Sequence, residues 1–125
     1  MEHEQNMADD QTTIHELKET VLSFIREREW GKYNTPKDLA LSISLEAAEL
    51  LEHYQWRETH KDTAEVEKEL ADIIIYCLQF ADKNGIDIST AVRSKMEMNR
   101  MKYPPQTKDL DAYLQAKQEH RAKNT

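Results

Sequence analysis

The 125-residue sequence predicts an all-α protein, with a four-helix-bundle core and a short fifth helix at the C-terminus. Two glycines and three prolines leave few places for tight turns and favour helices joined by short connections. Apolar residues recur at helical spacing in four long stretches, and residues typical of helix N-caps precede these stretches. The expected organisation is a disordered tail at 1–11, one domain at 12–105, and a C-terminal helix and tail at 106–125.

The first two helices are predicted from their N-terminal signals. Thr13-Ile-His-Glu16 matches a capping box, so a helix begins at residue 14 and is expected to end near Trp30. Thr35 is a second capping residue, and Pro36 suits the first helical position, where its missing N–H costs nothing. The second helix is then expected to run to about Trp56.

The third helix is expected from Asp62 or Thr63 to a stop at Asn84-Gly85, because glycine often ends a helix in the left-handed conformation. Its three consecutive isoleucines could indicate a strand, but the helical spacing continues for about twenty residues, beyond ordinary strand length. Asp87 or Ser89 caps a fourth helix, which ends before the prolines at 104 and 105. The fifth helix is expected over residues 110–118, begun near Thr107.

Composition limits the size of the core and the classes of partner. Hydrophobic residues make up 38% of the chain and charged residues 33%, so a monomer would be marginal and a homodimer or homotetramer is expected. A net charge of -7 argues against binding to a nucleic acid polymer or to an anionic membrane. No signal peptide or membrane span is visible, and the single Cys77 cannot form an internal disulfide. These features predict a soluble, cytoplasmic protein.

Two acidic pairs stand in apolar helical stretches. Glu46 and Glu49 share one helix face, as do Glu69 and Asp72 on the next helix. Two carboxylates about 4 Å apart repel by roughly 4 kcal/mol at an effective dielectric constant near 20. The acids therefore lie apart on the surface, which is common on exposed helices, or some are protonated, or a cation lies among them. Oxygen ligands alone would favour Mg²⁺, with Mn²⁺ as an alternative.

The two acidic pairs and their flanking residues resemble a known family. E46-A-A-E49 followed by E69-L-A-D72 is similar to the ExxE…ExxD signature of the MazG-like all-α nucleoside triphosphate pyrophosphohydrolases. The resemblance is closer to the dCTP pyrophosphatase branch and covers roughly residues 13–105. It is carried by REW at 28–30, EAAELLEHYQW at 46–56, ELADIIIYCL at 69–78 and SKMEMNRMKYP at 94–104.

This resemblance implies a catalytic and metal site formed by Glu46, Glu49, Glu69 and Asp72, which would hold Mg²⁺ against the triphosphate of a nucleotide. Hydrolysis between the α and β phosphates would then release a nucleoside monophosphate and pyrophosphate, as in house-cleaning of the dNTP pool. His53 is a candidate neighbour of these carboxylates. The implied substrate-binding residues are Trp30, Trp56, Tyr76, Lys95, Asn99 and Lys102.

Base preference and function class leave alternatives open. Cytosine-selective relatives carry a histidine where this chain has Val21 and another where it has Asn34, and this difference leaves the base preference open. The expected substrate is a deoxynucleotide, with dCTP or a modified dCTP first and dATP or dUTP as alternatives. A di-iron bundle would need Glu-x-x-His pairs, and the chain has none. Phosphoribosyl-ATP pyrophosphatase shares the acidic scaffold, but the tryptophan and NRMKYP blocks fit it poorly. A non-enzymatic helical interaction module would instead carry independent surface acids and show no response to metal.

Overall fold

The structure, a computed structural model, describes residues 7–59 and 62–123, and its regular elements there are all helical. Five α-helices and one short 3₁₀ helix follow one another, which confirms the predicted all-α class and the five helices. The chain divides into two compact units, Met1–Ile86 and Asp87–Thr125. Three of the four helices of the predicted core belong to the first unit, and the fourth belongs to the second.

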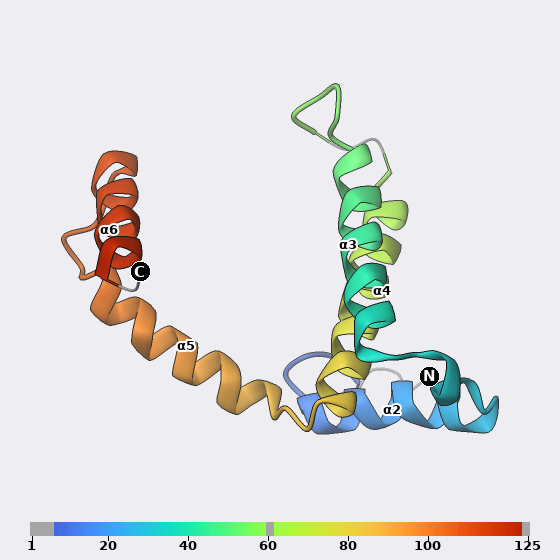
Figure 1. Ribbon diagram of the computed structural model, residues 1–125. Coiled ribbons are helices and arrows are strands. Elements are labelled where there is room, and N and C mark those ends of the chain that lie inside the picture. Colours follow the sequence, from blue (N-terminus) through green and yellow to red (C-terminus); the bar gives the residue numbers. More distant parts are fainter. Residues whose placement is uncertain (1–6, 60–61, 124–125) are drawn as a thin grey trace. The chain divides into compact units, whose positions relative to one another are not determined.

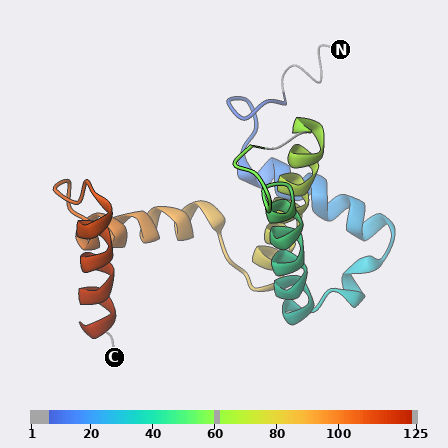
Figure 2. The same ribbon diagram turned by 90° about the horizontal axis from the view of Figure 1, so that it is seen from above.

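The first unit is built on an antiparallel pair, α3 (Pro36–Glu52) and α4 (Thr63–Lys83), which lie side by side (Figure 1). Helix α2 (Ile14–Glu27) packs across the C-terminal end of α4, and both views show this arrangement (Figure 2). Among the described residues, three apolar side chains are buried: Leu39, Leu78 and Ala81. The core of this unit is therefore small, as the composition predicts.

The predicted helix starts are confirmed by capping hydrogen bonds. The Thr13 hydroxyl accepts from the Glu16 N–H, and the Thr35 hydroxyl accepts from the Asp38 N–H, both at 3.1 Å. The Asp62 carboxylate accepts from the Glu65 N–H at 3.3 Å. Gly85, with φ of 63°, takes the left-handed conformation expected after α4.

Two helices of the first unit end earlier than predicted. Helix α2 ends at Glu27 because Glu29 adopts a left-handed conformation, with φ of 54°. The chain then forms the 3₁₀ helix η1 (Trp30–Tyr33), which was not predicted. Helix α3 ends at Glu52 rather than near Trp56, because the next backbone N–H groups bond to carbonyls three residues back and close a turn.

The second unit contains α5 (Ile88–Lys102) and α6 (Leu110–Lys123). Asp87 caps α5 by accepting from the Thr90 N–H at 3.0 Å, and the rings of Tyr103 and Tyr113 stack with centroids 5.0 Å apart. Helix α6 extends five residues beyond its predicted end. The added EHRAK segment is rich in helix formers, and its basic side chains complement the negative end of the helix dipole.

The predicted disordered tail at 1–11 lies partly outside the described residues, because these begin at residue 7. Residues 7–11 form a turn, in which the Gln11 N–H donates to the Ala8 carbonyl at 2.8 Å. No helix within 7–59 and 62–123 is long and apolar enough to cross a membrane.

Candidate functional site

Three glutamates from α3 and α4 come together at the packed face of this helix pair. One carboxylate oxygen from each of Glu46, Glu49 and Glu69 lies within 4.8 Å of the other two. Glu46 and Glu49 are three residues apart and share a helix face, and the antiparallel packing places Glu69 opposite them. Glu46 and Glu69 are half-buried, whereas Glu49 is exposed. The structure brings these three of the four predicted acids together, with Glu49 keeping a solvent-facing side, and their role as a site stays a prediction.

Burial and like charge make this cluster unfavourable when all three acids are ionised. Burial, followed by a hydrogen bond with Glu49 and the charge of Glu49, raises the pKa of Glu46 to about 7. The pKa of Glu69 is also raised, first by burial and then by Glu49, with His53 acting in the opposite direction. His53 Nε2 lies 3.8 Å from Glu69 Oε1, so the histidine is a neighbour of the cluster. The cluster therefore favours retention of a proton or binding of a cation.

The residues present fit a divalent cation. Glu46 Oε2 and Glu69 Oε2 are buried oxygens without a hydrogen-bond partner among the described residues. Buried polar atoms are nearly always paired, so these two oxygens have unused capacity to bind a ligand. A set of carboxylate oxygens without thiolate suits a hard cation such as Mg²⁺ or Mn²⁺.

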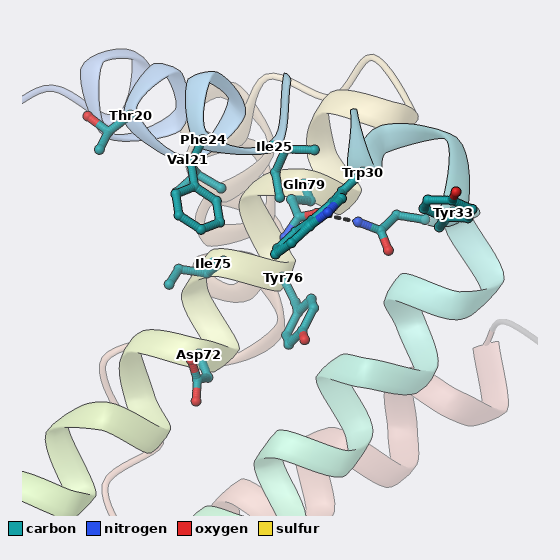
Figure 3. A pocket seen from close by; sticks show the side chains of 11 residues that line it. Thr20, Val21, Phe24, Ile25, Trp30, Tyr33, Asp72, Ile75, Tyr76 and Gln79 are labelled. Carbon is teal, nitrogen blue, oxygen red and sulfur yellow. Dashed lines mark hydrogen bonds between the residues drawn. The ribbon is translucent and has the colours of Figure 1, made fainter. Parts of the chain in front are cut away.

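Asp72 connects this cluster to a cavity of about 650 Å³ between α2, η1 and α4 (Figure 3). Its charge contributes to the raised pKa values of Glu46 and Glu69, and its side chain lines the cavity. The other lining residues are mostly apolar or aromatic: Thr20, Val21, Phe24, Ile25, Trp30, Tyr33, Asn34, Ile75, Tyr76 and Gln79. An apolar cavity that opens beside acidic groups can hold a ligand with an aromatic part and a charged part.

The aromatic walls include two of the three predicted base-binding residues. Trp30 and Tyr76 line the cavity, and Figure 3 shows both side chains beside α4. The Trp30 ring also contacts Phe24 edge to face, with centroids 5.6 Å apart. Trp56 lies in the turn after α3, is 86% exposed, and is not among the lining residues. Its role as a base wall remains a prediction.

The predicted phosphate-binding residues Lys95, Asn99 and Lys102 lie on α5, in the second unit. Their spacing of four and three residues places them on one face of this helix, as predicted. The Lys102 ammonium lies 5.0 Å from the centre of the Tyr103 ring. A role for these three residues at the acidic site remains a prediction.

Several cavity residues were not identified from the sequence, among them Phe24, Ile25, Ile75 and Gln79. A signal for part of this set is present, because residues 72, 75, 76 and 79 share one face of α4 by helical spacing. The face that carries a metal ligand and Tyr76 could therefore have been extended to Ile75 and Gln79. No comparable signal identifies Phe24 and Ile25, since α2 packs on α4 through contacts distant in sequence.

The raised pKa of Glu46 predicts a pH-dependent stability in the absence of metal. Its ordinary pKa is 4.5, and in the folded protein it is about 7. Between these values the folded state holds the proton more tightly than the unfolded state, so the free energy of unfolding falls as the pH rises. Thermal unfolding in EDTA from pH 5 to pH 7.5 should show this fall. The Glu46→Gln variant should show a shallower one, and equal slopes in the two proteins would contradict the assignment.

The sequence of this chain is similar to a known family and to named relatives. The model of the MazG-like family matches residues 41–115. The chain is similar to dCTP pyrophosphatase 1 of Rattus norvegicus, with 32% identity over 101 residues that cover 74% of this chain. The human protein of the same name is 31% identical over the same share. The chain spans 59% of the length of these curated relatives.

A solved structure extends this similarity to the fold. The crystal structure of a pyrophosphatase from Archaeoglobus fulgidus DSM 4304 superposes with a TM-score of 0.64. It is 44% identical in sequence, and the match covers 73% of this chain and 92% of that one. Family match, sequence identity and fold agree, and the chain belongs to the MazG-like family.

Proposed function

We propose that this protein hydrolyses deoxynucleoside triphosphates between the α and β phosphates, releasing a nucleoside monophosphate and pyrophosphate. The observation that carries the proposal is the acidic cluster of Glu46, Glu49 and Glu69 placed beside an apolar cavity, with Asp72 lining that cavity. The names of the relatives, dCTP pyrophosphatase 1 and pyrophosphatase, support the same reaction class. We assign the reaction to residues 12–105. The protein would have a house-cleaning role in the cytoplasmic nucleotide pool.

The four acids would hold Mg²⁺, with Mn²⁺ as an alternative. A bound divalent ion neutralises phosphate charge and lowers the pKa of a coordinated water. Glu46, Glu49 and Glu69 supply negative oxygens within a small volume, and two of these oxygens lack another partner. His53 Nε2 lies 3.8 Å from Glu69 Oε1, next to one of the carboxylates that would hold the ion.

The cavity would hold the base. Trp30 and Tyr76 offer ring faces for stacking, which is worth about 1–3 kcal/mol per base. The apolar walls at Val21, Phe24 and Ile75 exclude water from the bound ring. We assign Trp56 to a wall of the base site, and Lys95, Asn99 and Lys102 to the phosphates. Deoxycytidine triphosphates are the favoured substrates.

We also propose that the protein forms a homodimer or a homotetramer. Leu41 and Leu45 lie one turn apart on α3 and are 58% and 57% exposed. Leu70 and Ile74 repeat this pattern on α4, at 53% and 42%. Large apolar side chains exposed in a row favour association with another surface, and a second copy of the chain is the partner we propose.

The test is product identification with a panel of dNTPs. Incubation with Mg²⁺ should convert at least one deoxynucleoside triphosphate to its monophosphate and pyrophosphate in equal amounts, and EDTA should stop the reaction. Phosphate and nucleoside diphosphate as products would contradict cleavage between the α and β phosphates. No turnover across the panel would favour the non-enzymatic interaction module instead.

A further inference from the structure

Arg28 contacts the aromatic wall of the cavity without lining the cavity itself. Its guanidinium carbon lies 3.7 Å from the centre of the Phe24 ring and 5.9 Å from the centre of the Trp30 ring. Both rings line the cavity, and they meet edge to face. A guanidinium within about 6 Å of the centre of an aromatic ring is attracted to the face of that ring. One cation therefore contacts both aromatic side chains on this side of the cavity.

The backbone at Glu29 brings Arg28 and Trp30 to the same ring. Glu29 is the one described residue other than glycine with a positive φ, at 54°. A residue with a Cβ rarely adopts this left-handed conformation, and residues that do so are frequent at functional sites. The chain changes direction here, between α2 and η1, and both neighbours of Glu29 contact Phe24.

The backbone of η1 is attached to α4 by two hydrogen bonds. The Lys83 ammonium donates to the Gly31 carbonyl at 2.8 Å, and Asn34 Nδ2 donates to Gln79 Oε1 at 2.9 Å. These bonds fix the path of the chain next to Trp30, but neither of them holds its ring. The orientation of the ring depends on what packs against the ring itself.

Phe24 and Trp30 are 46% and 47% exposed, although both line the cavity. A half-exposed side chain is packed on part of its surface only, so it keeps rotamer freedom that is lost when a ligand binds. The Arg28 guanidinium covers part of these rings. Its Nη1 also donates to the Phe24 carbonyl at 3.1 Å, which restricts the guanidinium in turn.

We propose, on the basis of the proposed function, that Arg28 is a positioning residue, which keeps the rings of Phe24 and Trp30 in the orientation that receives the base. Arg28 acts on this wall and not on the reacting atoms, so it contributes to binding rather than to the chemical step. An alternative role is capping of α2, because a basic side chain near a helix C-terminus can bond to the last carbonyls. Lysine could fill that role, but it lacks the flat guanidinium that stacks on rings.

The kinetic test uses the full-length protein with dCTP and Mg²⁺. Arg28→Ala should raise KM by about three- to tenfold and change kcat by less than about twofold, because a cation on an aromatic ring contributes to binding on this scale. Arg28→Lys should also raise KM. A wild-type KM in Arg28→Lys would indicate capping alone and would overturn the proposal. A fall in kcat at unchanged KM in Arg28→Ala would overturn it too.

Arg26→Ala is the matched control. Arg26 is another basic residue in the last turn of α2, forms an ion pair with Glu19 at 3.1 Å and does not line the cavity. This variant should keep the wild-type KM, although it loses the same charge at the same end of the helix. An equal rise in KM in Arg26→Ala and Arg28→Ala would contradict a specific role for Arg28.

The fluorescence of Trp30 tests the contact independently of hydrolysis. The chain has two tryptophans, so Trp56→Phe leaves the signal of Trp30 alone. In this background, Arg28→Ala and Arg28→Lys should increase quenching by acrylamide and lower the fluorescence anisotropy, whereas Arg26→Ala should change neither. If no triphosphate is hydrolysed, the proposed function fails, but these changes would still support the positioning of Trp30 by Arg28. Unchanged fluorescence in both Arg28 variants would overturn the proposal, whatever the activity.

Discussion

Replacing Glu49 by glutamine is expected to lower kcat for deoxynucleotide hydrolysis by about 100-fold to 1,000-fold. Glu49 contributes the largest charge effect on both Glu46 and Glu69, so its carboxylate is central to the cluster. Glutamine has the same shape but carries no negative charge to offer a cation. Because Glu49 is exposed, the substitution should leave the packing of α3 on α4 intact. Steady-state kinetics with the substrate found in the panel measure the effect.

Although it should lower activity, Glu49→Gln should stabilise the metal-free protein against unfolding. Removing one of three clustered like charges relieves repulsion, so the unfolding midpoint in EDTA should rise. Glu52→Gln, an exposed change on the same helix and outside the cluster, is the control and should alter neither activity nor midpoint strongly. Full activity in the Glu49→Gln variant would show that Glu49 is not part of the catalytic site. Lost activity with a lowered midpoint would indicate a folding defect instead.

Replacing Leu45 by glutamate is expected to convert the proposed dimer into a monomer. Leu41 and Leu45 are exposed one turn apart, and a charge at the centre of an apolar contact leaves an unpaired carboxylate buried on association. Sedimentation velocity at micromolar protein should show the shift in mass. The loss of apolar contacts should also lower the thermal midpoint, because so few side chains are buried within one chain.

Leu51→Glu is the matched control for this change. Leu51 is on the same helix and is 66% exposed, but it follows Leu45 by six residues and so lies about a third of a turn around α3. This variant should keep the mass of the wild type. A monomeric wild type, or dissociation by both substitutions alike, would contradict the assignment of Leu41 and Leu45 to an interface.

The predictable parts of the fold are those set by local chemistry. Thr13, Thr35 and Asp62 could be identified as caps because a capping side chain bonds to an N–H three residues later. Gly85 could be identified because it tolerates the left-handed conformation. The end of α2 could not be placed in the same way, because Glu29 adopts that conformation without being glycine.

In the candidate site too, some residues could be predicted from the sequence and others could not. Glu46 and Glu49, and then Glu69, could be identified from spacing and family resemblance, because acids on facing helices meet when the helices pack. Their surroundings were less predictable. The apolar neighbours Ala47, Ala48 and Leu51 are exposed, so the apolar stretch of sequence around Glu46 and Glu49 does not enclose these acids on all sides. The hydrogen bond between the side chains of Asn34 and Gln79 depends on tertiary packing, and no local sequence pattern predicts it.

Helix α4 carries both Asp72, beside the acidic cluster, and Gln79, at the far part of the cavity wall. Seven residues of helix span about 10 Å, and the helix is stiff along its axis. The segment that carries Trp30 is attached to the same helix through Lys83 and Gln79. The distance between the groups that would hold phosphate and the groups that would hold the base is therefore built into one rigid element. In the proposed reaction, this fixed distance would favour nucleotides in which the linkage between base and phosphate has the matching length.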